Sequence, residues 1–119
     1  MTTLPPVKES AILYSCIQWL AAHGCDVVRC NTGGAKKSYT SKKTGKTKTH
    51  FIRFGKKGMG DIIAINPRGR WIEVETKRVG NEQRKEQLAR EAVVKSKNGV
   101  YILAYSSDDL EARKQEILA

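Results

Sequence analysis

Three carboxylates and a lysine lie close together in residues 58–87, a stretch that reads GMGDIIAINPRGRWIEVETKRVGNEQRKEQ. Asp61 begins a run of β-branched residues, and Glu73, Glu75 and Lys77 occupy every second position of a later run. Neighbouring carboxylates repel each other unless a cation lies between them, and oxygen ligands of this kind suit Mg²⁺ or Mn²⁺. Mg²⁺ in particular binds one or two carboxylates together with waters and the phosphate oxygens of a substrate. The residue types therefore predict a divalent-metal site that acts on phosphate groups.

A β-hairpin is the element expected to position these groups. Residues 61–65 and 71–77 have the β-branched content and the alternation of strands, and residues 66–69 supply a turn with proline at its second position. Side chains alternate between the two faces of a strand, so the second strand has one ionic face and one apolar face. A solvated antiparallel strand would show the same alternation. The glycines before Asp61 favour the functional interpretation, because they allow the backbone to approach another group closely.

The order of these motifs resembles the PD-(D/E)xK nuclease core, in which an Asp at the head of one strand is followed by Glu-x-Lys on the next. Here GMGD stands in place of Pro-Asp. More closely, KKGMGDIIAI, then IEVETKR, then a helix bearing Gln87 resembles the VRR-NUC family of virus-type replication-repair nucleases. The resemblance covers about the last two-thirds of the chain. It implies an α/β fold with a mixed β-sheet flanked by helices.

The resemblance also implies roles for individual residues. Asp61 and Glu75 match the acids that bind the metal, and Lys77 matches the lysine that assists the attacking water. Gln87 matches a glutamine on the helix that follows. We expect the carbonyl of Thr76 to be a further metal ligand. The cofactor expected is Mg²⁺, for which Mn²⁺ can substitute.

Two of these assignments have alternatives. Gln83 competes with Gln87, since the two fall one turn apart on the same face of the helix expected over 83–97. Glu9 is the one acid available on the helix expected over 7–23, and the resembled family carries an acid there that reaches toward the metal. Glu9 is therefore a candidate catalytic residue and metal ligand. A favourable acid in the first turn of a helix is the alternative explanation.

A basic segment precedes Asp61. Residues 31–60 contain no acid, whereas charges in the rest of the chain nearly cancel, so the net charge of +10 is concentrated here. A localised positive charge of this kind predicts binding to the phosphates of a nucleic acid. Tyr39 lies among these lysines and could stack on a base. The residues assigned to DNA binding are Lys36, Lys37, Lys42, Lys43, Lys46, Lys48, Lys56, Lys57 and Arg78.

The remaining patterns indicate one α/β domain over residues 1–119. A chain of this length has room for one hydrophobic core. The first helix should bury Leu13, Cys16 and Leu20, and the 83–97 helix should turn Leu88, Ala92 and Val93 inward. The other expected elements are strands at 25–31, 51–54 and 100–105, and a last helix from Ser107 with capping-box spacing between Asp108 and Glu111.

Composition bears on order and on compartment. Residues 32–50 contain almost nothing to bury, so we expect a mobile basic loop or a long flexible hairpin. Cys16, Cys25 and Cys30 are odd in number and lack C-x-x-C spacing, which argues against a disulfide framework or a zinc knuckle. The mean hydropathy is −0.49 and the sequence has no long apolar run, so the cytoplasm is the expected location.

These observations predict a metal-dependent endonuclease that hydrolyses phosphodiester bonds in DNA. Stand-alone members of the resembled family imply a homodimer that acts on branched or Holliday-junction DNA in replication, repair or recombination. One alternative is a non-catalytic nucleic-acid-binding protein whose acids are only charges on a strand surface. Another is an enzyme of similar core directed at RNA. A chelator such as EDTA distinguishes the nuclease from the non-catalytic binding protein, because only the nuclease should require a metal.

Overall fold

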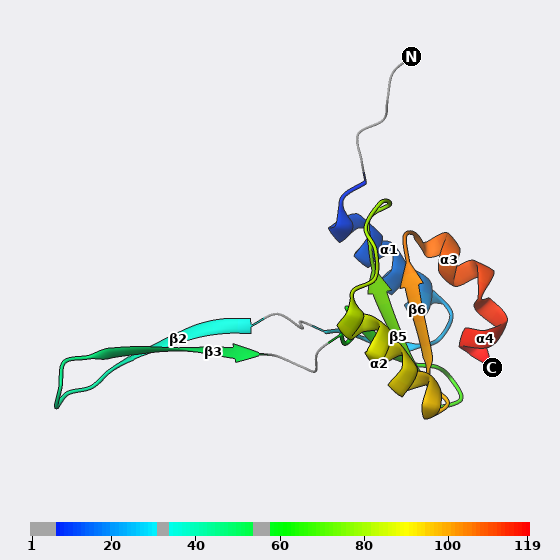
Figure 1. Ribbon diagram of the computed structural model, residues 1–119. Helices are drawn as coiled ribbons and strands as arrows, with labels where there is room; N and C mark the ends of the chain where they lie inside the picture. The colour runs from blue at the N-terminus through cyan, green and yellow to red at the C-terminus, as the bar shows by residue number, and fades with distance from the viewer. Residues whose placement is uncertain (1–6, 31–33, 54–57) are drawn as a thin grey trace, which may run out of the picture.

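The computed structural model describes residues 7–30, 34–53 and 58–119. Its elements begin with a helix and a run of five strands, followed by a helix, a sixth strand and two short helices (Figure 1). In chain order they are α1 (Glu9–Ala22), β1 (Asp26–Arg29), β2 (Gly34–Thr40), β3 (Thr47–Arg53), β4 (Ile62–Ile65), β5 (Trp71–Thr76), α2 (Lys85–Ser96), β6 (Val100–Ala104), α3 (Ser107–Ala112) and α4 (Lys114–Leu118).

The body of the molecule is built on a four-stranded mixed sheet with the strand order β1-β4-β5-β6. Antiparallel pairing joins β1 to β4 and β4 to β5, and β6 runs parallel to β5 after the crossover through α2. The hairpin predicted from the turn at 66–69 is confirmed. The predicted α/β class with a mixed sheet flanked by helices is also confirmed.

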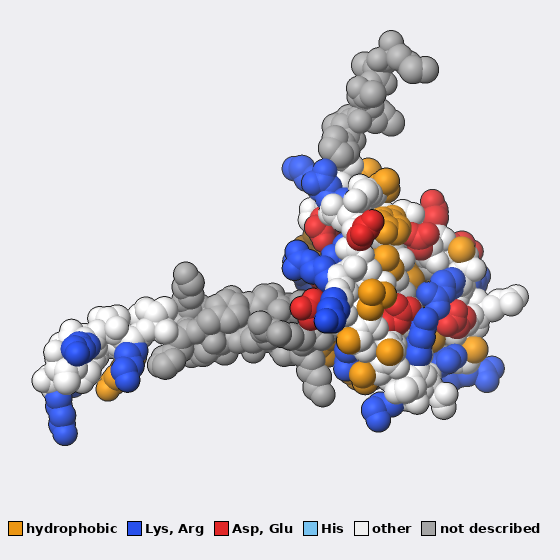
Figure 2. Space-filling model, in the orientation of Figure 1, with side chains coloured by type: hydrophobic (Ala, Val, Ile, Leu, Met, Phe, Trp, Pro, Cys, Tyr) orange, Lys and Arg blue, Asp and Glu red, His pale blue; other side chains and the backbone are white. Residues whose placement is uncertain are grey.

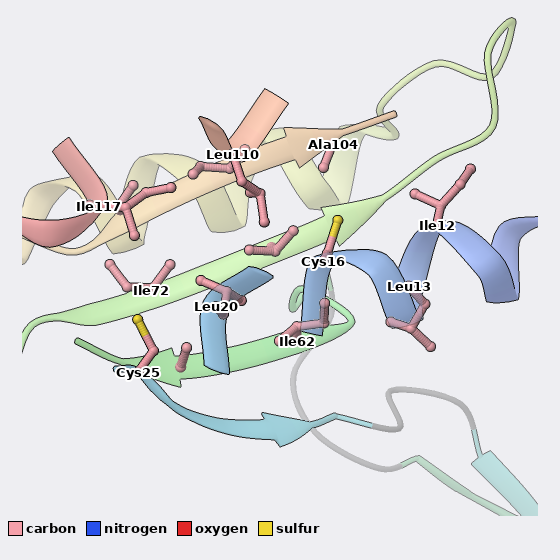
Figure 3. Packing of buried hydrophobic residues seen from close by; sticks show 14 residues of the cluster. Ile12, Leu13, Cys16, Leu20, Cys25, Ile62, Ile72, Ala104, Leu110 and Ile117 are labelled. Atoms are coloured by element: carbon pink, nitrogen blue, oxygen red, sulfur yellow. The ribbon is translucent and has the colours of Figure 1, made fainter. Parts of the chain in front are cut away.

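One face of the sheet carries the hydrophobic core, and α1, α3 and α4 cover it (Figure 3). The predicted stripe of Leu13, Cys16 and Leu20 is buried there, against Ile62 and Ile72 of the sheet. Burial raises the pKa of the Cys16 thiol to about 12, so this cysteine is a neutral, inert part of the core.

The other face of the sheet lies toward α2, and the prediction for this helix is wrong. Leu88, Ala92 and Val93 are exposed, whereas Gln87 and Val94 are buried. The reason lies in β5, whose second face carries glutamates. A helix that covers carboxylates must supply polar partners, so it turns its polar side chains toward the sheet.

In the region predicted as a mobile loop, 32–50, the described residues 34–50 form most of a two-stranded ribbon. Strands β2 and β3 pair with each other in antiparallel register and not with the four-stranded sheet, and the ribbon projects from the body in Figure 1. Of the two predictions for this region, the hairpin is the one formed. Cross-strand hydroxyl pairs, Ser38 with Thr49 and Thr40 with Thr47, support the ladder where apolar pairs are missing.

The C-terminal residues form two short helices rather than the one predicted. Ser106, not Asp108, is the N-cap of α3, because its side chain accepts a hydrogen bond from the Asp108 N–H. The carboxylate of Asp109 completes the capping box in place of Glu111. Among the described residues, no helix is long and apolar enough to cross a membrane.

Candidate active site

Asp61 and Glu75 are brought together by the register of two neighbouring strands. Ile62 pairs with Val74 in antiparallel register. Asp61, which precedes Ile62, therefore lies opposite Glu75, which follows Val74. The Asp61 carboxylate is oriented by the end of β5, since its Oδ2 atom accepts hydrogen bonds from the Thr76 N–H at 2.9 Å and the Thr76 hydroxyl at 3.0 Å. The spacing in the sequence thus places the two acids on adjacent strands at one edge of the body.

Glu75 is buried, with 5% of its surface exposed, and it has two partners. Its Oε1 atom accepts a 2.7 Å hydrogen bond from the Gln87 side-chain amide and lies 3.6 Å from the Lys77 ammonium. Burial raises the pKa of Glu75 to about 7; the Asp61 carboxylate adds to the rise and Lys77 opposes it. A carboxyl group held in this way favours a cation beside it, because the cation would offset the cost of its buried charge.

Two glycines allow the strands and α2 to approach closely at this point. An added Cβ at Gly60 would lie 2.9 Å from the Val74 carbonyl oxygen, and one at Gly58 would lie 2.0 Å from the Glu86 carbonyl oxygen. Gly58 also has a positive φ of 74°. The close backbone approach that the sequence predicted before Asp61 is confirmed. It packs the N-terminal turn of α2 against residues 58–61, which are called the Asp61 segment below.

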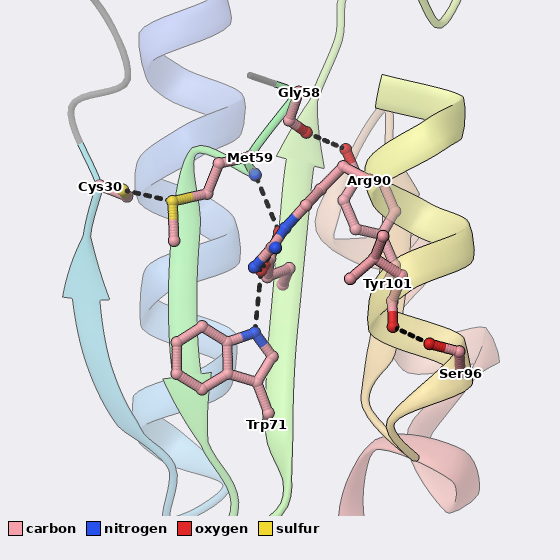
Figure 4. Close-up of polar contacts among 10 residues, drawn as sticks. Cys30, Gly58, Met59, Trp71, Arg90, Ser96 and Tyr101 are labelled. Carbon is pink, nitrogen blue, oxygen red and sulfur yellow. Dashed lines mark hydrogen bonds and ion pairs between the residues drawn. The ribbon is translucent and has the colours of Figure 1, made fainter. Parts of the chain in front are cut away.

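Glu73 has a role that the sequence did not reveal. Its side chain is fully buried and its carboxylate accepts hydrogen bonds from Arg90 on α2, from the Trp71 indole at 2.9 Å and from the Gly60 N–H at 3.1 Å (Figure 4). The pairing with Glu73 raises the pKa of Arg90. The one signal in the sequence is the spacing of Gln87 and Arg90, three residues apart on a helix, which places both on one face.

The network around Glu73 connects this structural acid to the candidate site. Through Gly60, Glu73 fixes the backbone directly before Asp61, and through Arg90 it fixes the helix that carries Gln87. The Tyr101 hydroxyl adds a 3.1 Å hydrogen bond to the Gly58 carbonyl (Figure 4). Alternate residues of β5 on the same face therefore have different roles, since Glu73 is enclosed by donors whereas Glu75 faces the Asp61 carboxylate.

Comparison with known proteins supports the architecture. A solved structure described as a VRR_NUC domain matches with a TM-score of 0.61 and 16% sequence identity, over 90% of this chain and 94% of the other. The chain has the VRR_NUC fold. No family model matches the chain, and no curated protein matches its sequence. The predicted resemblance to VRR-NUC nucleases is therefore confirmed as a fold, with the PD-(D/E)xK-like core that it implied.

Within this VRR_NUC fold, Gln87 and Gln83 have different surroundings. Gln87 contacts Glu75, while Gln83 precedes α2 and donates a 3.2 Å hydrogen bond to Glu91. Glu9 is exposed at the start of α1, and its charge contributes to the raised pKa of Glu75. The structure thus brings Gln87 into the site and leaves Gln83 outside it.

The carboxylate oxygens of the site suit a hard divalent cation. In residues 7–30, 34–53 and 58–119, no group of three or more His, Cys, Asp or Glu side chains is arranged to hold a metal, so Glu9 does not join Asp61 and Glu75 in such a group. In the same ranges, hydrogen bonds engage Oδ2 of Asp61 and Oε1 of Glu75 and no other oxygen of these carboxylates. Two carboxylates with free oxygens fit Mg²⁺, which completes its octahedron with waters and substrate phosphate.

The basic residues assigned to DNA binding fall into three groups. Lys42, Lys43, Lys46 and Lys48 are exposed at the outer end of the β2–β3 ribbon, where Figure 2 shows cationic side chains gathered. Arg78 is exposed just after β5, beside the candidate site. Lys36 and Lys37 lie on β2, of which the backbone is described, and Lys56 and Lys57 lie outside the described residues.

Proposed function

We propose that the protein is a Mg²⁺- or Mn²⁺-dependent nuclease that hydrolyses phosphodiester bonds in DNA. One observation carries the proposal: in a VRR_NUC fold, Asp61 and Glu75 face each other on adjacent strands, and Glu75 bears both Lys77 and Gln87 as partners. Asp61 lies directly before β4, Glu75 and Lys77 lie at and just after the end of β5, and Gln87 lies on α2, so the fold rather than sequence proximity assembles the group.

Each residue of the group has a chemical role in this proposal. Asp61, Glu75 and the Thr76 carbonyl would hold the divalent ion, which supplies an activated water and offsets charge that develops on the phosphate. Lys77 lies 3.6 Å from Glu75 with 12% of its side chain exposed, a position from which its ammonium can orient the attacking water, or its neutral amine can accept a proton from that water. Gln87 orients Glu75 by its hydrogen bond.

Glu9 has a secondary place in the proposal. It begins α1 and is exposed, and it acts on Glu75 through its charge. From there it can bind a water of the metal or reach the metal itself when substrate is present. The exposed lysines of the ribbon, together with Arg78, supply phosphate contacts that position the DNA.

We further propose that the active form is a homodimer that acts on branched or junction DNA. On the sheet face opposite α1, Ile65 and Trp71 are direct partners in the register and are 44% and 41% exposed, and Val28 on β1 and Val93 on α2 are 59% and 44% exposed. A groove of about 260 Å³ continues this apolar surface between Trp71 and Val93. A second copy of the chain would cover the surface and place two sites on one substrate.

The dimer is tested by light scattering on the full chain. Ile65→Glu should give monomers at concentrations where the wild type is dimeric. Val79→Glu is the matched control, because Val79 is 88% exposed and lies away from the apolar face on the loop after β5. A monomeric wild type, or an Ile65→Glu variant that still forms dimers, contradicts the dimer.

The nuclease activity is tested with labelled single-stranded, duplex, flap and four-way-junction DNA in Mg²⁺, Mn²⁺ or EDTA. Asp61→Asn, Glu75→Gln and Lys77→Ala should each abolish cleavage while anisotropy shows that DNA binding persists. Asp26→Asn is the control, since Asp26 is an exposed acid at the opposite end of β1 from the site. Glu9→Gln should reduce cleavage without abolishing it.

The other outcomes separate the alternatives. Binding without cleavage under every metal condition would indicate a non-catalytic nucleic-acid-binding protein. Cleavage of RNA strands in preference to matched DNA strands would redirect the proposal to RNA. Cleavage that survives EDTA or the Glu75→Gln substitution would remove the metal site from the mechanism.

A further inference from the structure

The β2–β3 ribbon leaves the body directly beside the candidate site. The last pair of β1 and β4 is Arg29 with Ile62, and beyond it the Cys30 N–H donates a 2.7 Å hydrogen bond to the Asp61 carbonyl. The Cys30 thiol also contacts the Met59 sulfur at 3.6 Å (Figure 4). The described residues on the two sides of the ribbon, Cys30 and Gly58, therefore both lie close to Asp61. A nucleic acid held at Asp61 would also lie beside the body end of the ribbon.

The outer half of the ribbon has two different faces. Ser38 pairs with Thr49 and Thr40 with Thr47 through their hydroxyls, which places these four side chains on one face. Tyr39 is opposite Lys48 in the register and lies on the other face, 63% exposed. In this outer half, residues 38–49, neither face has an apolar set that could pack on a protein core, so this part of the ribbon is built to remain solvated or to meet a polar partner.

The tip of the ribbon is a compact cationic turn. The Ser41 N–H donates to the Lys46 carbonyl and the Gly45 N–H to the Ser41 carbonyl, both at 2.9 Å, with Gly45 at a φ of +67°. This turn projects Lys42 and Lys43 beyond the strands. No acid occurs in residues 31–60, so the cations at the tip have no partner within the segment that bears them. The chemistry that would pair with them is a polyanion.

We infer that the ribbon is an arm that binds duplex DNA roughly one helical turn away from the phosphate that is cleaved. A two-stranded β-ribbon is narrow enough to enter the major groove of B-form DNA. The chain spans at most about 3.5 Å per residue, so the connection from Cys30 to the start of β2 and the length of β2 place the tip within roughly 40 Å of Asp61. One turn of B-form DNA is about 34 Å.

The inference rests on the proposed nuclease function and adds the substrate class to it. Contacts at the catalytic group alone would need only a few nucleotides of any geometry. An arm of this length and charge requires a continuous duplex on one side of the cleaved bond. The protein should therefore prefer substrates with a duplex segment at least as long as the reach of the arm.

The test measures binding of fluorescein-labelled duplexes from about 8 to about 30 base pairs, a range that spans the arm's reach of roughly one 10-base-pair turn. Measurements are made in EDTA, across a salt series, with single strands of equal length beside each duplex. One variant changes Lys42, Lys43, Lys46 and Lys48 to Gln, and its matched control changes the same four residues to Arg. Because β2 and β3 pair only with each other, both variants should retain the wild-type melting temperature.

We expect the affinity of the wild type and of the Arg variant to rise with duplex length until both site and arm are filled. The Gln variant should lose this rise, and its log-log salt slope should fall by about 0.9 for each phosphate contact removed. An unchanged length dependence and salt slope would overturn the inference, and so would an equal loss on single strands.

The arm and the catalytic proposal can fail separately. If no nucleic acid is cleaved but the Gln variant loses the length dependence, the arm stands without the nuclease. If cleavage depends on Glu75 but the Gln variant binds every duplex as the wild type does, the nuclease stands without the arm.

Discussion

Gln87 on α2 donates a 2.7 Å hydrogen bond to Glu75 on β5, and the same amide accepts a 2.8 Å hydrogen bond from the Arg84 N–H at the start of the helix. One side chain therefore caps α2 and holds a candidate metal ligand. Because both partners are buried or part-buried, the orientation of Glu75 depends on the position of the helix. The contact also distinguishes Gln87 from Gln83, which contacts Glu91 instead.

We predict that Gln87→Leu lowers cleavage and metal affinity together, whereas Gln83→Leu does not. Loss of a group that orients a metal ligand usually costs a factor of about 10 to 100 in metal affinity or activity. The measurement is the single-turnover rate as a function of Mg²⁺ concentration. A merely structural role would lower the amount of folded protein without moving the Mg²⁺ midpoint, so an unmoved midpoint would refute the orienting role.

The raised pKa of Glu75 predicts a pH dependence of stability in the metal-free protein. A carboxyl whose pKa rises from 4.5 to about 7 on folding binds more protons in the folded state. The free energy of unfolding therefore falls as pH rises through this window, by an amount on the order of 3 kcal/mol. Thermal unfolding in EDTA between about pH 4 and 8 should show this fall for the wild type and not for Glu75→Gln.

Two controls accompany the pH series. Asp26→Asn removes an exposed carboxylate and should leave the fall in stability unchanged. Addition of Mg²⁺ at about pH 8 should raise the melting temperature of the wild type, because a ligand that binds the folded state stabilises it. The melting temperature of Glu75→Gln should stay unchanged, because this variant lacks a carboxylate that binds the metal. Equal pH dependence in wild type and Glu75→Gln would mean that Glu75 is not the group responsible.

The sequence predicted the hairpin and its acids because two strong local rules apply there. Side chains alternate along a strand, and an Asn-Pro-Arg-Gly turn fixes which strands pair, so Asp61 and Glu75 could be assigned to neighbouring strands. The stripe of α1 followed in the same way from helical periodicity. Each rule depends on residues close together in the chain.

The sequence did not predict which face of α2 is buried. Apolar periodicity favoured Leu88 and Val93, whereas the partner surface is the ionic face of β5, which selects Gln87 and Arg90. The ribbon posed a similar difficulty, because Thr, Ser and Lys give no apolar pattern and the strands are held by backbone pairing and hydroxyl contacts. In both cases long-range polar pairing overrides local hydrophobicity.

We predict a strong coupling between Glu73 and Arg90. Arg90→Met would leave the carboxylate of Glu73 buried without its cation, which typically costs about 3 to 5 kcal/mol. Adding Glu73→Gln to Arg90→Met should recover part of this loss, because the amide keeps an acceptor for the Gly60 N–H or the Trp71 indole and has no charge. Urea unfolding of the wild type, the two single variants and the double variant measures the coupling energy.

An exposed ion pair provides the comparison for this cycle. Lys95 and Glu91 form an i,i+4 pair on the same helix, with 57% of the Lys95 side chain exposed. Lys95→Met should cost no more than about 0.5 kcal/mol. If Arg90→Met is as mild as Lys95→Met, the Glu73 network does not hold α2 on the sheet.

The last prediction concerns Gly58, which seats α2 beside the Asp61 segment. An added Cβ would lie 2.0 Å from the Glu86 carbonyl oxygen and 2.8 Å from the Gln87 nitrogen, so Gly58→Ala must push the first turn of α2 away from β5. Gly45 and Gly69 also have positive φ but have no atom within 4 Å of an added Cβ, so Gly45→Ala and Gly69→Ala report the backbone strain alone, about 1 kcal/mol. Gly58→Ala should therefore lose clearly more stability than either control. In the molecules that remain folded, it should also weaken Mg²⁺ binding as Gln87→Leu does, because the displaced helix moves Gln87 away from Glu75. Melting temperatures and Mg²⁺ titrations of the three variants decide the matter: if Gly58→Ala matches the two controls in both, the seating of α2 does not determine the geometry of Glu75.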